Sequence, residues 1–126
     1  MRNNKVLPVV PATVKKYLNS FFDGEPAGYL GGQFILSLVR DYLLDPDKYC
    51  VKPSVINRMM KEKETAILTI SFNDKDYALF EECAALEMRS LVKQGTWILL
   101  SIAASFKQMK IKKITVQNNT VTFKIR

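Results

Sequence analysis

Hydrophobic and polar residues alternate strictly over residues 67 to 72, and this pattern predicts a half-buried β-strand. Successive side chains of a strand face opposite sides, so the two sets separate cleanly. The inward set is apolar and the outward set is mixed: Leu68, Ile70 and Phe72 against Ile67, Thr69 and Ser71. The strand should therefore cover a core with one face and present the other to solvent.

Two helices should follow this strand. Asn73 or Asp74 can cap a helix over residues 74 to 91, whose apolar side chains recur at spacings of three and four. Gly95 and Thr96 then predict a break, with Thr96 as the cap of a second helix, Trp97 to Lys107. That second helix is apolar on almost every side, so we expect it to be buried.

The first forty residues repeat this plan in outline. An apolar stretch at residues 6 to 10 contains Pro8, so any strand there should be short or at an edge. One helix should open near Pro11, and a strongly apolar second helix should run from Gln33 to Leu44. Residues 34 to 39 match residues 98 to 103 at a constant offset of 64. The match suggests a tandem duplication, in which residues 6 to 10 would pair with residues 67 to 72.

Two further elements complete the predicted fold. A short helix should begin at Pro53 and reach about Lys63, and residues 111 to 125 should form a hairpin turning at Asn118 and Asn119. We therefore expect an α+β, mainly helical fold with a C-terminal β-hairpin, in a single compact domain. Its parts would be a first strand-helix-helix half (1–45), a linker helix (46–64), a second half (65–108) and a basic hairpin (109–126).

A winged-helix domain is the alternative fold. The order of helix, strand, two helices and hairpin over residues 53 to 125 suits it, with the hairpin as a wing on the DNA backbone. Its recognition helix would be Trp97 to Phe106. That segment is almost wholly apolar and suits a core better than a DNA groove.

The strand, helix and helix of residues 67 to 106 resemble the ribbon-helix-helix family of DNA-binding proteins, the Arc and MetJ type. The resemblance implies an antiparallel ribbon in the major groove of double-stranded DNA. It makes Thr69 and Ser71, beside Ile67, the base readers, and the amides of Gly95 and Thr96 the phosphate anchor. The outward strand positions hold no Arg, Lys, Asn or Gln, so they lack the side chains that read bases in pairs of hydrogen bonds.

Charge supports a polyanionic partner. The chain carries a net charge of +7, with 19 basic and 12 acidic residues. From residue 89 onward there are eight basic residues and no acidic one, an asymmetry typical of nucleic-acid binding. The cations expected to contact phosphate are Lys107, Lys110, Lys112, Lys113, Lys124 and Arg126. The resulting hypothesis is a small basic DNA-binding protein, acting in transcription regulation, plasmid partition or conjugative transfer.

Features of a catalytic centre are absent from the sequence. There is no histidine, and Cys50 and Cys83 lack the spacing of metal ligands. Asp41 and Asp45 would share a helix face, a pattern more typical of a solvated surface than of acid–base catalysis. We therefore expect no enzymatic activity, metal, cofactor or small-molecule substrate. No apolar run is long enough for a membrane helix and no signal peptide is evident, so a cytoplasmic location is expected.

A second function is also compatible with the sequence. The apolar helices 33–44 and 97–107 could pair between subunits, as in a homodimer, instead of within one chain acting as a tandem pseudo-dimer. The protein would then be an adaptor or assembly subunit of a secretion or transfer machine.

Overall fold

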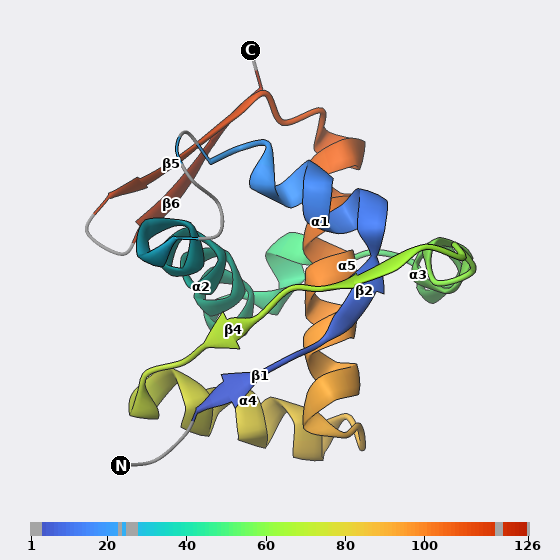
Figure 1. Ribbon diagram of the computed structural model, residues 1–126, viewed down its shortest axis with the longest axis vertical. Helices are drawn as coiled ribbons and strands as arrows, with labels where there is room; N and C mark the ends of the chain where they lie inside the picture. The colour runs from blue at the N-terminus through green and yellow to red at the C-terminus, as the bar shows by residue number, and fades with distance from the viewer. Residues whose placement is uncertain (1–3, 23, 25–27, 118–119, 126) are drawn as a thin grey trace.

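The computed structural model describes residues 4–22, 24, 28–117 and 120–125 (Figure 1). The predicted α+β, mainly helical class with a C-terminal hairpin is confirmed. The elements in chain order are β1 (Lys5–Val6), β2 (Val9–Pro11), α1 (Ala12–Asn19), α2 (Tyr29–Leu44), the 3-10 helix η1 (Pro46–Tyr49), α3 (Pro53–Met59), β3 (Thr65–Ile67), β4 (Ile70–Ser71), α4 (Asp74–Leu86), α5 (Leu91–Met109), β5 (Lys113–Gln117) and β6 (Thr120–Lys124).

Four short strands make one antiparallel ribbon. β1 pairs with β4, with Val6 opposite Ile70, and β2 pairs with β3, with Val9 opposite Ile67. Both pairs share a register, and a hydrogen bond from the Leu68 amide to the Pro8 carbonyl, 3.2 Å long, joins them. We call residues 4–11 and 65–72 together the ribbon. The predicted pairing of residues 6 to 10 with residues 67 to 72 is confirmed.

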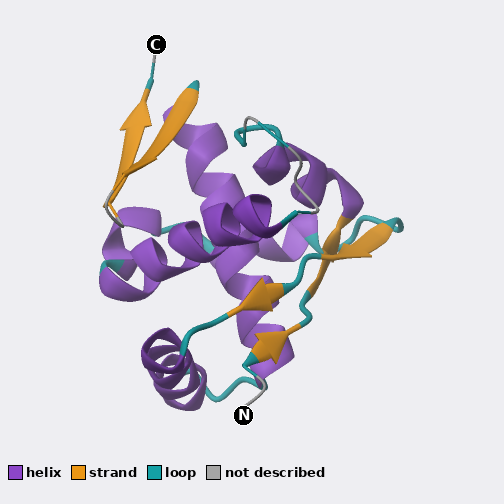
Figure 2. Cartoon of the chain, turned by 60° about the vertical axis from the view of Figure 1, so that its left-hand side comes forward, coloured by secondary structure: helices purple, strands orange, loops and turns teal. Residues whose placement is uncertain are grey.

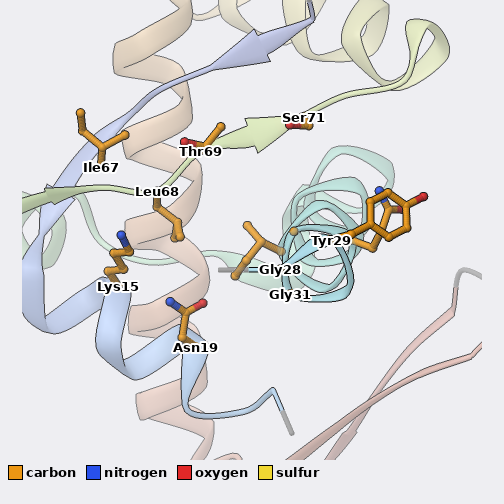
Figure 3. A pocket seen from close by; sticks show the side chains of 12 residues that line it. Lys15, Asn19, Gly28, Tyr29, Gly31, Ile67, Leu68, Thr69 and Ser71 are labelled. Carbon is orange, nitrogen blue, oxygen red and sulfur yellow. The ribbon is translucent and has the colours of Figure 1, made fainter. Parts of the chain in front are cut away.

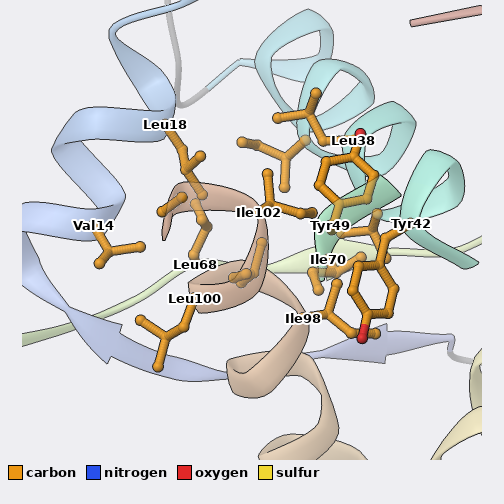
Figure 4. Close-up of a cluster of buried hydrophobic side chains, with 14 of the residues drawn as sticks. Val14, Leu18, Leu38, Tyr42, Tyr49, Leu68, Ile70, Ile98, Leu100 and Ile102 are labelled. Carbon is orange, nitrogen blue, oxygen red and sulfur yellow. The ribbon is translucent and has the colours of Figure 1, made fainter. Parts of the chain in front are cut away.

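The ribbon covers the core with its inner face. Val6, Val10, Leu68 and Ile70 are buried against the two long helices, α2 and α5. These helices cross behind the ribbon and contact each other (Figure 4). The expected burial of α5 is confirmed, because its side chains from position 98 to 106 are all buried.

The two halves of the chain correspond at a constant difference of 64 in residue number, and the pairing of the ribbon agrees with this difference. Val6 and Ile70 face each other and differ by 64 in number. The same shift moves the bounds of α2 to 93 and 108, inside α5. Adding 64 also takes the buried Ser37 to the buried Ser101. The hydroxyl of each serine donates to the carbonyl four residues earlier. The strand-helix-helix order therefore occurs twice, and Val6 and Ile70 are the pair at which the difference of 64 and the strand register coincide.

The turn between α4 and α5 lies earlier than predicted. The helix expected to reach residue 91 ends at Leu86, and α5 begins at Leu91 instead of Trp97. Met88 takes a left-handed conformation with φ 57°, and the Ser90 side chain accepts from the Lys93 amide to cap α5. No glycine or proline marks this turn, which explains why the sequence pattern missed it.

Gly95, which appeared to be a helix break, lies inside α5. A Cβ atom at this position would lie 3.1 Å from both Cβ and Cγ of Pro8 in the ribbon. Glycine is therefore present because the ribbon approaches the helix closely.

The C-terminal hairpin packs on α2 and on an aromatic cluster. The ring of Tyr49 lies 6.2 Å from that of Phe106 and 6.0 Å from that of Phe123 in β6. The predicted turn at residues 118 and 119 lies outside the described residues. The winged-helix alternative fails because α5, its recognition helix, is enclosed by the core.

Candidate nucleic-acid interface

The outer face of the ribbon is open to solvent and consists of facing pairs. Lys5 faces Ser71 and Val9 faces Ile67. Leu7 and Thr69 form the row between them. The two ends of this face differ in character. Val9 and Ile67 at one end are 45% and 48% exposed, and Leu7 in the middle row is 49% exposed. The other end carries the ammonium group of Lys5 and the hydroxyl group of Ser71, and Thr69 adds a hydroxyl group beside Leu7. The predicted outward orientation of Ile67, Thr69 and Ser71 is confirmed.

A groove opens along the β3–β4 edge of the ribbon (Figure 3). Its walls are the ribbon, helix α1 and the first turn of α2. Lys15 and Asn19 of α1 reach it from one side, and Tyr29 at the start of α2 closes the other. We call it the first groove; its lining residues are Lys15, Asn19, Gly28, Tyr29, Gly31, Gly32, Gln33, Ile35, Ile67, Leu68, Thr69 and Ser71.

A second groove opens along the β2 edge. It is bounded by the ribbon, α3 and the first turns of α5, and is lined by Val9, Val10, Pro11, Asn57, Met60, Thr65, Arg89, Val92, Lys93, Thr96 and Trp97. The guanidinium carbon of Arg89 lies 4.1 Å from the centroid of the Trp97 ring. Arg89 also donates to the Gln94 side chain over 3.1 Å and pairs with Glu87. These contacts hold its charge at the rim of the groove.

The two grooves occupy equivalent places in the two halves. Four residues of the first groove have counterparts in the second groove whose numbers are higher by 64. Gly28, Tyr29, Gly32 and Gln33 correspond in this way to Val92, Lys93, Thr96 and Trp97. Each groove thus opens at the amino-terminal turn of a long helix. Neither first turn contains an acidic residue, and none lines either groove among the described residues. The positive ends of both helix dipoles and the cations Lys15 and Lys93 therefore favour anions there, whereas the charge of Arg89 is already paired with Glu87.

The phosphate anchor predicted at the amides of Gly95 and Thr96 is wrong, because these residues do not begin a helix. Both residues are buried in the second turn of α5, where backbone amides serve the helical hydrogen bonds. The Thr96 hydroxyl donates to the carbonyl of Val9 over 2.8 Å and so satisfies the edge of the ribbon. The free amides of this helix belong to Leu91 and Val92, whereas the Lys93 amide is capped by Ser90.

The C-terminal cations do not join the ribbon surface. Lys110, Lys112, Lys113 and Lys124 are exposed at the root and outer side of the hairpin, which lies beyond α2 when viewed from the ribbon (Figure 2). Lys107 extends over the ring of Tyr17 with its amino group 4.9 Å from the centroid. Arg126 lies outside the described residues. The predicted base readers and the predicted phosphate contacts therefore form two separate surfaces.

Sequence patterns alone missed the cations that flank the ribbon. Lys5, Lys15, Arg89 and Lys93 come from four segments, and the first two belong to a region whose acidic and basic residues nearly balance. Their places around the ribbon follow only from the tertiary structure. The one available signal was the offset of 64, which relates the starts of α2 and α5.

Two other properties concern the described residues alone. No helix among them has the length and apolarity needed to cross a membrane. They also include no group of three or more His, Cys, Asp or Glu residues that could hold a metal ion.

Comparison of the chain with protein-family models, with curated proteins and with solved structures finds no match.

Proposed function

We propose that this protein binds double-stranded DNA by inserting the ribbon into the major groove. The observation that carries the proposal is the antiparallel ribbon within one chain, with Val6 opposite Ile70 and Val9 opposite Ile67, and a cationic groove on each side. B-DNA admits a two-stranded ribbon in its major groove. The arrangement is that expected of a ribbon-helix-helix pseudo-dimer, in which one polypeptide supplies both halves.

The grooves supply the contacts to the DNA backbone in this proposal. The phosphates that border the major groove would meet the amino-terminal turns of α2 and α5. Lys15 would neutralise phosphate at the first groove and Lys93 at the second. Lys5, on the outer face of the ribbon, can donate to the acceptor atoms of guanine. The hairpin cations face away from this duplex and form a second basic surface.

The adaptor function has less support in the structure. Its basis was the surplus of aromatic and aliphatic residues in the first 45 residues, which would let the two apolar helices pair between subunits. However, α2 and α5 contact each other within one chain. Their central side chains, such as Leu38 and Leu99, are fully buried there. A partner chain is therefore not needed to cover them.

Titration into a fluorescent duplex of about 30 base pairs tests the proposal. Anisotropy at two salt concentrations should show binding that weakens steeply as salt rises, because bound cations release counterions from the phosphates. One chain per site should saturate the duplex, since each chain carries both halves of the ribbon. Absence of binding at low salt would refute the proposal.

A further inference from the structure

The outer face of the ribbon carries an aliphatic patch that is open to solvent. Leu7, Val9 and Ile67 each expose about half of their surface, and Val9 and Ile67 face each other across the strands. Their neighbours of opposite orientation, such as Val10 and Leu68, already cover the core. The exposed half of the patch is therefore available to a ligand.

The surroundings of the patch indicate an anionic ligand of elongated shape. The grooves on both sides contain cations and helix amino termini, and no acidic residue lines them among the described positions. A purely apolar partner would leave these cations and helix amino termini without an anionic partner at the edges of the patch. A DNA duplex satisfies both requirements, because its backbones are anionic and the floor of its major groove includes one apolar group, the 5-methyl group of thymine.

We propose that Leu7, Val9 and Ile67 recognise thymine methyl groups in the major groove. The inference rests on the proposed function and adds its base preference. Leu7, Val9 and Ile67 have no side-chain donor or acceptor, so the hydrogen-bonding edges of the other bases offer them no partner. The row of Lys5 and Ser71 lies at the other end of the face and can pair with acceptors such as guanine N7 and O6. The preferred site therefore has thymines under one half of the ribbon and a more polar sequence under the other.

Replacement of thymine by deoxyuridine tests this inference, because it removes the methyl group and leaves the base pair intact. A preferred duplex is first selected from a randomised pool with the wild-type protein. Each thymine is then replaced in turn. We expect the dissociation constant to rise about fourfold for each contacted methyl group. This change corresponds to about 0.8 kcal/mol, the free energy of burying one CH2 group.

Two variants make the assignment specific to the patch. Leu7→Ser, Val9→Ser and Ile67→Ser combined should bind thymine and deoxyuridine duplexes equally. Leu44→Ser and Leu86→Ser combined remove exposed leucines from other surfaces and should keep the wild-type discrimination. Circular dichroism checks folding, and the wild-type series remains decisive if the triple variant does not fold.

The outcomes separate this inference from the proposed function. Duplex binding that does not depend on the methyl groups would overturn the inference and leave DNA binding intact. Failure to bind any duplex at low salt would overturn both. If the wild type then forms dimers that the triple serine variant does not, the patch is a contact between copies of the chain.

Discussion

Gly95 and Gly32 are two helical glycines with opposite surroundings. A Cβ atom at Gly95 would lie 3.1 Å from the Pro8 ring, whereas one at Gly32 would meet nothing within 4 Å. Pro8 cannot move away easily, because its carbonyl accepts from Leu68 in the ribbon.

Substitution of each glycine by alanine should therefore have opposite effects on stability. Gly95→Ala should lower the free energy of unfolding by about 1 kcal/mol or more, since overpacking outweighs the gain in helix propensity. Gly32→Ala should raise it by up to about 1 kcal/mol, because alanine favours the helix and meets no obstacle. Urea denaturation of both variants measures the difference, and an equal shift of the two midpoints would contradict the close approach of ribbon and helix.

The thiol of Cys83 should react slowly with alkylating agents at neutral pH, and its alkylation rate should rise only at high pH. Burial, reinforced by the Glu87 carboxylate, raises the pKa of its thiol above the ordinary value. Only the thiolate reacts, so the midpoint of the alkylation rate against pH should lie higher for the folded protein than for the denatured one. Alkylation kinetics of a Cys50→Ser variant isolate this group. A midpoint for the folded protein at or below that of the denatured protein would contradict the raised pKa.

At the scale of elements, a buried ion pair joins the two halves of the chain. Arg40 of α2 donates from Nε and Nη2 to the same oxygen of Asp76 in α4, over 2.8 and 2.7 Å. The side chains are only 16% and 6% exposed, so loss of Asp76 would take a carboxylate away from a largely buried guanidinium group.

Asp76→Ala should lower the free energy of unfolding by about 3 kcal/mol. The double variant Arg40→Met with Asp76→Leu should lose less, because it removes both charges and fills the space. Glu82→Ala, an exposed site on the same helix, should change stability by less than about 0.5 kcal/mol. A double variant as unstable as Asp76→Ala would show that the charge on Arg40 is not the cause.

Local sequence patterns predicted the helices and strands better than the turns between them. The period of two in residues 67 to 72 and in the hairpin was sufficient, because each strand covers the core with one face. The start of α5 was missed because Met88 adopts a left-handed conformation without glycine. Conversely, Gly95 suggested a break although its role is to admit the ribbon. A glycine indicates a need for space or for backbone freedom, and only the tertiary structure distinguishes the two.

At the scale of the whole molecule, the sequence indicated a basic region but not its position relative to the ribbon. Pairing of residues 4–11 with 65–72 builds a ribbon with Lys5 on its outer face, and the grooves along its two edges hold Lys15 and Lys93, although these residues are far apart in the chain. The hairpin cations, contiguous in sequence, lie beyond α2. The net charge of a segment therefore did not locate the candidate interface.

The salt dependence of duplex binding, measured for two matched variants, tests the central claim most directly. Lys5→Gln, Lys15→Gln and Lys93→Gln remove three charges beside the ribbon, and Lys112→Gln, Lys113→Gln and Lys124→Gln remove three from the hairpin. Each lost phosphate contact should reduce the slope of log K against log salt by about 0.9. We predict a slope shallower by about 2 to 3 for the ribbon variant and an unchanged slope for the hairpin variant. The reverse result would place the DNA on the hairpin and contradict insertion of the ribbon.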